Sequence, residues 1–246
     1  MLGKKTKGAD NVVVQNAAKT LMANIRFASI DNPIRSIVLT SSVPNEGKST
    51  VSINLAQAIA SSGKTVLLVE CDMRRRSLAN IMGLHAKNGL FAVLSGRATL
   101  EEAVLATSQR GLYFLDAEPH IPNPADILIS KRFARMVSNM EATYDYVIFD
   151  TPPVGAFVDA AILSSVADAT VLVVRENFTR REEVVHAFEQ LQKASGANVI
   201  GTVMNFCETD SSEYYYEYYN KDGKRQKKGA AAVAAPVAGR GMGARV

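Results

Sequence analysis

A glycine, a lysine and two hydroxyl side chains stand together in the stretch S-S-V-P-N-E-G-K-S-T, residues 41–50. An apolar run precedes this stretch and a helical pattern follows it, which is the context of a phosphate-binding P-loop. In such a loop, backbone N–H groups at the start of the helix point into a concavity that holds a phosphate. We expect nucleotide binding through six residues of this loop: Asn45, Glu46, Gly47, Lys48, Ser49 and Thr50.

Two side chains of the loop have more specific expected roles. Lys48 should bridge the β- and γ-phosphates, and the Ser49 hydroxyl should take a coordination position of Mg²⁺. The pattern G-x-x-x-x-G-K-[ST] has one departure, because Ser42 stands at the position of the first glycine. An ordinary strand-to-helix turn is the alternative interpretation, and carboxylates further along the chain argue against it.

Three of these carboxylates end apolar runs. Glu70 and Asp72 close V-L-L-V-E-C-D, and Asp150 closes Y-V-I-F-D. Two residues that stand two apart in an extended chain point to the same face, which predicts that Glu70 and Asp72 do so. Ligands of open α/β sheets lie beyond the carboxyl ends of the strands. We therefore expect a Mg²⁺–nucleotide site in which Ser49, Asp72 and Asp150 serve the metal, the two acids by orienting its bound waters.

The rest of the chain supplies the elements that position these motifs. Apolar runs rich in Val, Ile and Leu predict strands at 36–41, 65–70, 112–115, 146–150, 170–174 and 199–205. Helical spacing predicts helices at about 13–27, 48–61, 124–140 and 180–194. Nearly continuous apolar strands are typical of a parallel sheet covered on both faces. The alternation of strand and helix predicts a doubly wound α/β fold with a mostly parallel sheet.

Charge and length separate a body from a tail. The 246 residues carry a net charge of +4, but residues 220–246 hold four Lys, three Arg and one Asp, which leaves +6 there and −2 in the remainder. Such a basic tail is most often a solvated linker, so we expect no specific nucleic-acid partner. Two cysteines without metal or redox spacing predict a cytoplasmic protein, and no apolar run is long enough to span a bilayer.

The sequence E-Y-Y-Y-E-Y-Y-N at residues 213–220 concentrates five of the eight tyrosines. Its spacing fits neither a core strand nor a core helix, so the phenols should be solvated. Clustered, solvated phenols beside glutamates suggest phosphate acceptors: Tyr214, Tyr215, Tyr216, Tyr218 and Tyr219. The predicted organisation is a flexible N-terminus (1–11), a P-loop kinase domain (12–210), the tyrosine cluster (211–220) and a disordered tail that is first basic and then rich in Ala and Gly (221–246).

Taken together, these motifs resemble those of the bacterial tyrosine kinases, over roughly residues 12–220. The chain has the P-loop, the stretch E-C-D-M-R at 70–74 in the place of a second acidic motif of the form D-x-D-x-R, the sequence D-T-P-P at 150–153 and a tyrosine-rich tail. The resemblance implies a P-loop NTPase of the deviant Walker type, related to division-site ATPases, that uses ATP and Mg²⁺ to phosphorylate its own tail. It also implies a membrane-anchored activator, homo-oligomers, a location at the inner face of the cell membrane, and regulation of capsular or exopolysaccharide synthesis and export.

Several residue roles follow only from this resemblance. Lys48 and the three acids Glu70, Asp72 and Asp150 would be catalytic, and either Glu70 or Asp72 would accept the phenol proton. Arg74 would contact phosphate or pair with an acidic partner, and the alternative interpretation is that it opens a solvated run of three arginines. Asn205 matches the position that reads adenine, but an asparagine at a strand end is also a common turn residue.

Two departures from the family pattern concern Glu70 and the first helix. Glu70 stands where the family usually has an aspartate, and residues 16–22 keep only Lys19 of the basic pattern used in ring assembly. A switch ATPase of the partitioning or division-site kind is the main alternative, but those proteins carry a second lysine at the start of the P-loop, which is absent here. A nucleotide-binding scaffold that has lost catalysis is the other.

Overall fold

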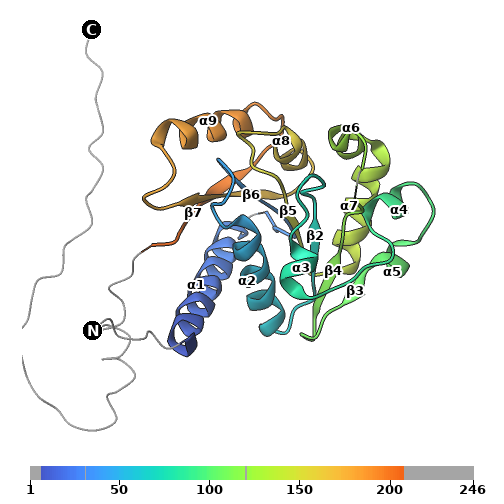
Figure 1. Ribbon diagram of the computed structural model, residues 1–246, viewed down its shortest axis with the longest axis horizontal. Coiled ribbons are helices and arrows are strands. Elements are labelled where there is room, and N and C mark those ends of the chain that lie inside the picture. Colours follow the sequence, from blue (N-terminus) through green and yellow to red (C-terminus); the bar gives the residue numbers. More distant parts are fainter. Residues whose placement is uncertain (1–6, 31, 120, 208–246) are drawn as a thin grey trace, which may run out of the picture. The chain divides into compact units, whose positions relative to one another are not determined.

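A seven-stranded sheet forms the centre of the computed structural model, which describes residues 7–30, 32–119 and 121–207 (Figure 1). The strand order is β3-β4-β2-β5-β1-β6-β7, and every pairing is parallel except that of the edge strand β3 with β4. The strands are β1 Ser36–Ser41, β2 Val66–Glu70, β3 Leu105–Ala106, β4 Leu112–Leu115, β5 Tyr146–Asp150, β6 Ala169–Arg175 and β7 Val199–Asn205. The mostly parallel α/β fold predicted from the sequence is confirmed.

The helices are α1 Lys7–Ala28, α2 Lys48–Ser61, α3 Leu78–Met82, α4 Leu90–Leu94, α5 Leu100–Ala103, α6 Pro124–Ile129, α7 Lys131–Thr143, α8 Asp159–Ser164 and α9 Arg181–Gln192. The single helix predicted over 124–140 is in fact α6 and α7. Ser130 separates the two, because its extended backbone ends α6 while its hydroxyl accepts a hydrogen bond from the Phe133 N–H and caps α7. Helices α3, α4, α5 and α8 were not predicted, because each is too short to show a helical period.

The first helix begins earlier than the sequence suggested. The segment 1–11 was expected to be flexible, but α1 starts at Lys7. Residues 7–11 include no proline and only one glycine, Gly8. A glycine inside a helix costs only about 1 kcal/mol, so nothing in these residues prevents the helix from starting at Lys7. The predicted tyrosine cluster and basic tail, residues 211–246, lie outside the described residues.

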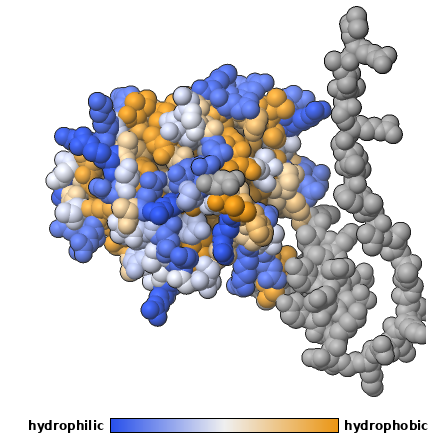
Figure 2. Space-filling view, turned by 180° about the vertical axis from the view of Figure 1, so that it is seen from behind, coloured by the Kyte–Doolittle hydropathy of each residue, from blue (hydrophilic) through white to orange (hydrophobic). Residues whose placement is uncertain are grey.

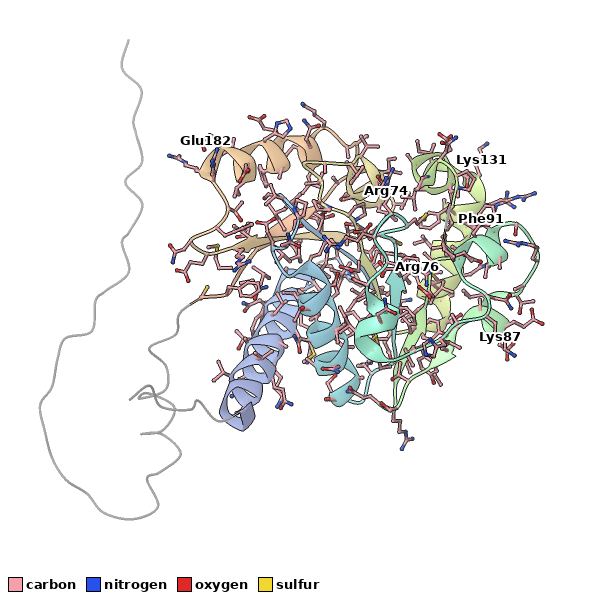
Figure 3. The ribbon with its side chains drawn as sticks, in the orientation of Figure 1. Arg74, Arg76, Lys87, Phe91, Lys131 and Glu182 are labelled. Carbon is pink, nitrogen blue, oxygen red and sulfur yellow. The ribbon has the colours of Figure 1, made fainter. Side chains whose placement is uncertain are left out.

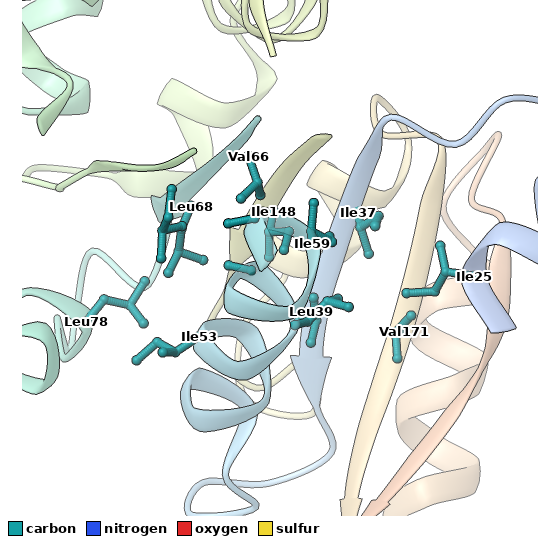
Figure 4. Close-up of a cluster of buried hydrophobic side chains, with 14 of the residues drawn as sticks. Ile25, Ile37, Leu39, Ile53, Ile59, Val66, Leu68, Leu78, Ile148 and Val171 are labelled. Atoms are coloured by element: carbon teal, nitrogen blue, oxygen red, sulfur yellow. The ribbon is translucent and has the colours of Figure 1, made fainter. Parts of the chain in front are cut away.

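Each face of the sheet is covered by helices, as the apolar strands require. Alternate residues of the central strand β1 point to opposite faces: Ile37 and Leu39 pack with Ile25 of α1 and with Ile53 and Ile59 of α2 (Figure 4). Val38 points the other way, into a cluster that includes Phe133, Met136, Val137 and Met140 of α7. Apolar and polar residues are intermixed on the molecular surface shown in Figure 2.

The strand register brings the motifs to one edge of the sheet. Strand β5 lies between β1 and β2, and Glu70 at the end of β2 is paired with Asp150 at the end of β5. The P-loop follows the neighbouring end of β1, and α2 begins directly after it. The carboxyl ends of three adjacent parallel strands therefore carry the predicted site. Within the described part of the chain, no helix is long and apolar enough to cross a membrane.

Candidate functional site

The P-loop has a backbone shaped to hold an anion. Asn45 and Gly47 have left-handed conformations, with φ of 68° and 86°, and helix α2 starts at the next residue, Lys48. None of the N–H groups of residues 45–49 donates a hydrogen bond to another residue in the described part of the chain. Alternating left-handed residues turn successive N–H groups into one concavity, and the start of α2 adds its partial positive charge. The loop thus fits a phosphate group.

Gly47 is required for two reasons. A side chain at φ 86° is strained, and a Cβ atom there would overlap the Asn205 amide nitrogen and lie 3.1 Å from Cε2 of Phe206. The end of β7 is therefore packed directly against the P-loop.

We expect Gly47→Ala to weaken ATP binding by about tenfold or more, because the loop must move away from Asn205 and lose its concave shape. Gly63→Ala is the matched control, since Gly63 also has φ 86° but nothing within 4 Å of the added Cβ. Both variants should lose about 1 kcal/mol from backbone strain, and Gly47→Ala should lose more because its Cβ also overlaps Asn205. Titration with a fluorescent ATP analogue, with thermal unfolding of the same samples, compares the two; equal affinities would contradict the role given to Gly47.

Lys48, Ser49, Asp72 and Asp150 meet at the mouth of this loop. The Lys48 ammonium lies 3.2 Å from Asp72 Oδ2 and 3.8 Å from Asp150 Oδ2. The Ser49 hydroxyl donates a 2.6 Å hydrogen bond to Asp150 Oδ2. The four residues predicted for phosphate and metal binding are thus brought together, and their contacts link the P-loop to the ends of β2 and β5.

Two serines that the sequence reasoning missed belong to the same cluster. Ser52 donates to Asp150 Oδ1 at 3.0 Å, and Ser77 donates to the Ser49 hydroxyl at 3.2 Å. Ser52 could have been found, because it lies three residues after Ser49 on α2 and therefore shares its helix face. Ser77 lies in the loop before α3, and no local pattern marks it. Burial raises the pKa of Asp150, while Lys48 and the two hydroxyl donors, Ser49 and Ser52, oppose that rise.

Glu70 has a different environment from Asp72. Strand β2 ends at Glu70, so the alternation of an extended chain does not extend to Asp72. Glu70 Oε1 accepts the N–H of Asp72 at 3.1 Å, and Oε2 accepts those of Ser77 and Leu78 at 2.8 and 3.0 Å. Burial, and then the nearby charge of Asp150, raises the pKa of Glu70 to about 8. The Glu70 carboxyl thus holds the loop before α3 and the start of that helix.

Asp72 keeps one oxygen towards the site. Its Oδ1 accepts the Arg75 N–H at 2.9 Å, which fixes the loop after β2, while Oδ2 faces Lys48. No other described residue engages Oδ2, so that atom becomes free if Lys48 turns towards a phosphate. Of the two acids left open by the sequence, Asp72 is the one that presents an oxygen to the P-loop lysine.

Two other predicted contact residues hold the loop in place with their side chains. The buried Glu46 carboxylate accepts the N–H groups of Val43 and Arg175, at 2.8 and 3.2 Å, and the Thr179 hydroxyl. Asn205 Nδ2 donates to the Glu46 carbonyl at 2.9 Å. Glu46 therefore offers a ligand only its backbone N–H, and Asn205 lies beside the P-loop at the position predicted for it.

Arg74 points to a different part of the structure from Lys48. Its guanidinium donates to Asp159 Oδ1 at 2.5 Å and stacks over the Phe157 ring, 4.2 Å from its centroid. Both partners belong to the segment around the start of α8. Of the roles left open for Arg74, the structure shows the pairing with an acidic partner, which fastens the loop after β2, and the phosphate contact stays a prediction.

The donor set agrees with the chemistry of magnesium. Among residues 7–30, 32–119 and 121–207, no group of three or more His, Cys, Asp and Glu side chains could hold a metal by itself. Mg²⁺ in nucleotide sites is bound by one or two carboxylates together with phosphate oxygens and water. Ser49, Asp150 and Asp72 offer one hydroxyl and two carboxylates beside the anion-binding loop, which fits such an ion.

Comparison with known proteins identifies relatives of this chain by sequence and by structure. A family model described as an AAA domain matches residues 12–199. The tyrosine-protein kinase YwqD of Bacillus subtilis is 39% identical over 209 residues, which cover 85% of this chain and 88% of that protein. The solved kinase domain of the Escherichia coli tyrosine kinase ETK superposes with a TM-score of 0.76 at 28% identity, over 80% of this chain and 77% of the other.

A more distant likeness concerns the fold alone. The septum site-determining protein MinD of Pyrococcus horikoshii, solved in complex with Mg-ADP, has a TM-score of 0.60 at 22% identity. The match covers 74% of this chain and 76% of the other. The predicted likeness of the fold to that of division-site P-loop ATPases is confirmed.

Proposed function

The chain belongs to the family of bacterial tyrosine-protein kinases, and we propose that it transfers the γ-phosphate of ATP to the tyrosines of its own C-terminal cluster. The observation that carries the proposal is the cluster of Lys48, Ser49, Asp72 and Asp150 at the mouth of a P-loop whose N–H groups are free among the described residues. The division-site ATPase of Pyrococcus horikoshii shares the fold at 22% identity, well below the 39% identity to the tyrosine-protein kinase YwqD.

The phosphate site works by positioning and by charge. Phosphoryl transfer passes through a loose transition state, so the protein needs to align the groups and neutralise charge more than to form bonds. Bound Mg²⁺ would neutralise charge on the β- and γ-phosphates. Lys48 leaves the carboxylates and contacts the same phosphates, while the N–H groups of residues 45–49 hold the β-phosphate.

Asp72 is the group that we assign to the phenol proton. Turning Lys48 towards the phosphate frees Asp72 Oδ2, whereas both oxygens of Glu70 accept backbone N–H groups. A tyrosine hydroxyl that approaches the γ-phosphate past the loop after β2 can donate to this oxygen as it attacks. Ser49 would take a coordination position of Mg²⁺, and Asp150 and Asp72 would orient its bound waters.

The acceptors are proposed to be Tyr214, Tyr215, Tyr216, Tyr218 and Tyr219, and transfer is proposed to run between two copies of the chain. A mixture of two variants tests both points. One chain carries Lys48→Met and keeps its tyrosines, and the other keeps Lys48 but has phenylalanine at all five positions. With ATP and Mg²⁺, phosphotyrosine should appear on the Lys48→Met chain in the mixture and on neither variant alone. If the wild-type chain forms phosphotyrosine under the same conditions and the mixture does not, transfer between copies is excluded.

The cellular role is proposed from the family. The kinase would regulate the synthesis and export of a capsular polysaccharide or exopolysaccharide, at the inner face of the membrane and together with a membrane-anchored activator. No specific nucleic-acid partner is proposed.

Self-association should depend little on Lys19, which is exposed on α1 and stands alone where the family has several charged residues. Lys19→Ala should leave the sedimentation coefficient of the protein nearly unchanged. A large decrease would show that this helix still makes the contact.

A further inference from the structure

An open pocket of about 680 Å³ lies beside the loop that follows β2. The apolar part of its lining consists of Met73, Pro119, Ile121 and Pro124. Its nitrogen donors are the side chains of Arg74, Arg76 and Asn80. Figure 3 shows Arg74 and Arg76 on this loop, on its side towards α6 and α7. Apolar walls suit an aromatic ring, and guanidinium and amide groups suit an anion.

Two of these donors have capacity left to bind a ligand. Arg76 pairs with Asp116 through Nη2 at 3.0 Å, but its side chain is 29% exposed and lines the pocket, so its guanidinium can also be reached by a ligand. The Asn80 side chain, exposed on α3, makes no hydrogen bond within the described part of the chain. Arg74, in contrast, is already held by Asp159. Arg76 and Asn80 are therefore the donors that a ligand in the pocket would meet.

The pocket and the phosphate site share one loop. Residues 72–77 present Asp72 to Lys48 and Ser77 to Ser49 on one side, and Met73, Arg74 and Arg76 to the pocket on the other. A peptide whose phenol reaches Asp72 would place its next residues one or two steps away, about 3.5–7 Å along an extended backbone. Those residues would lie at the pocket.

The tyrosine cluster carries a matching charge. In E-Y-Y-Y-E-Y-Y-N every tyrosine stands within two residues of Glu213 or Glu217. For Tyr214, Tyr215, Tyr218 and Tyr219 a glutamate stands one or two residues before the tyrosine, so a pocket on that side of the acceptor has a carboxylate within reach. Tyrosine rings next to the acceptor would meet the proline, isoleucine and methionine walls.

We propose that this pocket is the specificity subsite of the kinase, in which Arg76 and Asn80 bind the glutamate beside the acceptor tyrosine of a second copy of the chain. The inference rests on the proposed function and adds to it the class of substrate: tyrosine with an acidic residue one or two positions away. Arg76 and Asn80 act on the peptide and not on the reacting phosphate.

Binding of the synthetic peptide S-S-E-Y-Y-Y-E-Y-Y-N, residues 211–220, tests the subsite without catalysis. The receptor is the full chain with its five tail tyrosines replaced by Phe and with Glu213→Gln and Glu217→Gln, so that its own tail offers neither the phenols nor the glutamates of the peptide. Asn80→Asp should weaken binding of the peptide, measured by fluorescence anisotropy, by about fivefold, and Asn80→Lys should strengthen it. Asn139→Asp, an exposed asparagine of α7 with the same change of net charge, should have no effect.

Exchange of the peptide charge completes the test. A peptide in which Gln replaces both glutamates should bind the receptor that keeps Asn80 more weakly than the original peptide does. A peptide in which Lys replaces both glutamates should bind the Asn80→Asp receptor more tightly than the Asn80→Lys receptor, which is the reverse of the order expected for the original peptide. Arg76→Gln should also lower the affinity for the original peptide. This variant is made together with Asp116→Asn, because Arg76→Gln alone would leave the buried Asp116 carboxylate without its partner. Equal affinities of the Glu and Gln peptides would overturn the proposal.

Phosphorylation of the bound peptide separates this inference from the proposed function. If peptide binding depends on Asn80 and on the glutamates but ATP and Mg²⁺ produce no phosphotyrosine, the subsite stands and the assigned kinase reaction fails. If the peptide is phosphorylated at the same rate with Glu, Gln or Lys beside the tyrosine, the kinase stands and the subsite fails.

Discussion

Replacing Lys48 by methionine is expected to lower ATP-dependent formation of phosphotyrosine by at least about 100-fold. The ammonium group lies between Asp72 and Asp150 in the structure, at the N-terminal end of α2, where a phosphate would replace the two carboxylates. Methionine keeps the length of the side chain and removes its charge. The rate is measured with the wild-type tail as acceptor and an antibody against phosphotyrosine.

The fold must be followed in the same experiment. The Lys48 side chain is only 13% exposed, so its loss leaves two buried acids without their cation and should lower the unfolding temperature. Lys48→Arg keeps the charge and should recover stability, but a planar guanidinium does not replace the compact ammonium at the phosphates, so activity should stay low. Lys87→Met, at an exposed position away from the site, is the control and should change neither quantity. A folded Lys48→Met chain with full activity would contradict the P-loop assignment.

Asp72→Asn should lower kcat by about 100-fold or more, because it removes the oxygen that we assign to the phenol proton. The asparagine Oδ1 can still accept the Arg75 N–H, so the loop should keep its conformation, but the loss of the ion pair with Lys48 should lower the unfolding temperature, as expected for Lys48→Met. Steady-state kinetics with the tail peptide as acceptor give kcat and KM separately. A variant that loses ATP affinity but keeps kcat would assign Asp72 to metal binding alone.

Glu70→Asp provides the contrast to Asp72→Asn. The aspartate restores the acid usual in the family, but its shorter side chain cannot reach the N–H groups of Ser77 and Leu78 while it keeps that of Asp72. Leaving buried N–H groups unpaired costs about 1–3 kcal/mol each, so the free energy of unfolding should fall while kcat falls by less than about tenfold. Denaturant unfolding and kinetics on the same variant check this expectation. A variant that keeps its stability and loses all activity would move the base to Glu70.

The strand and helix pattern was largely readable from the sequence. Strands buried on both faces need continuous apolar residues, and the P-loop needs glycine and lysine in a set order, so both leave local signals. The short helices α3, α4, α5 and α8 leave no such signal. The break at Ser130 was missed because a serine fits a helix interior and a helix cap equally well until the backbone is known.

The sequence by itself determined which residues can do chemistry, namely Lys48, Ser49, Asp72 and Asp150, because charge and hydroxyl groups are properties of single residues. Only the tertiary structure decided how each is used. The bond between Ser49 and Asp150 joins residues 101 positions apart, and that between Asp159 and Arg74 joins residues 85 apart. Burial and the available N–H donors turn Glu70 into the anchor of α3 and leave Asp72 open to Lys48. Those partners come from distant parts of the chain, and local spacing carries no information about them.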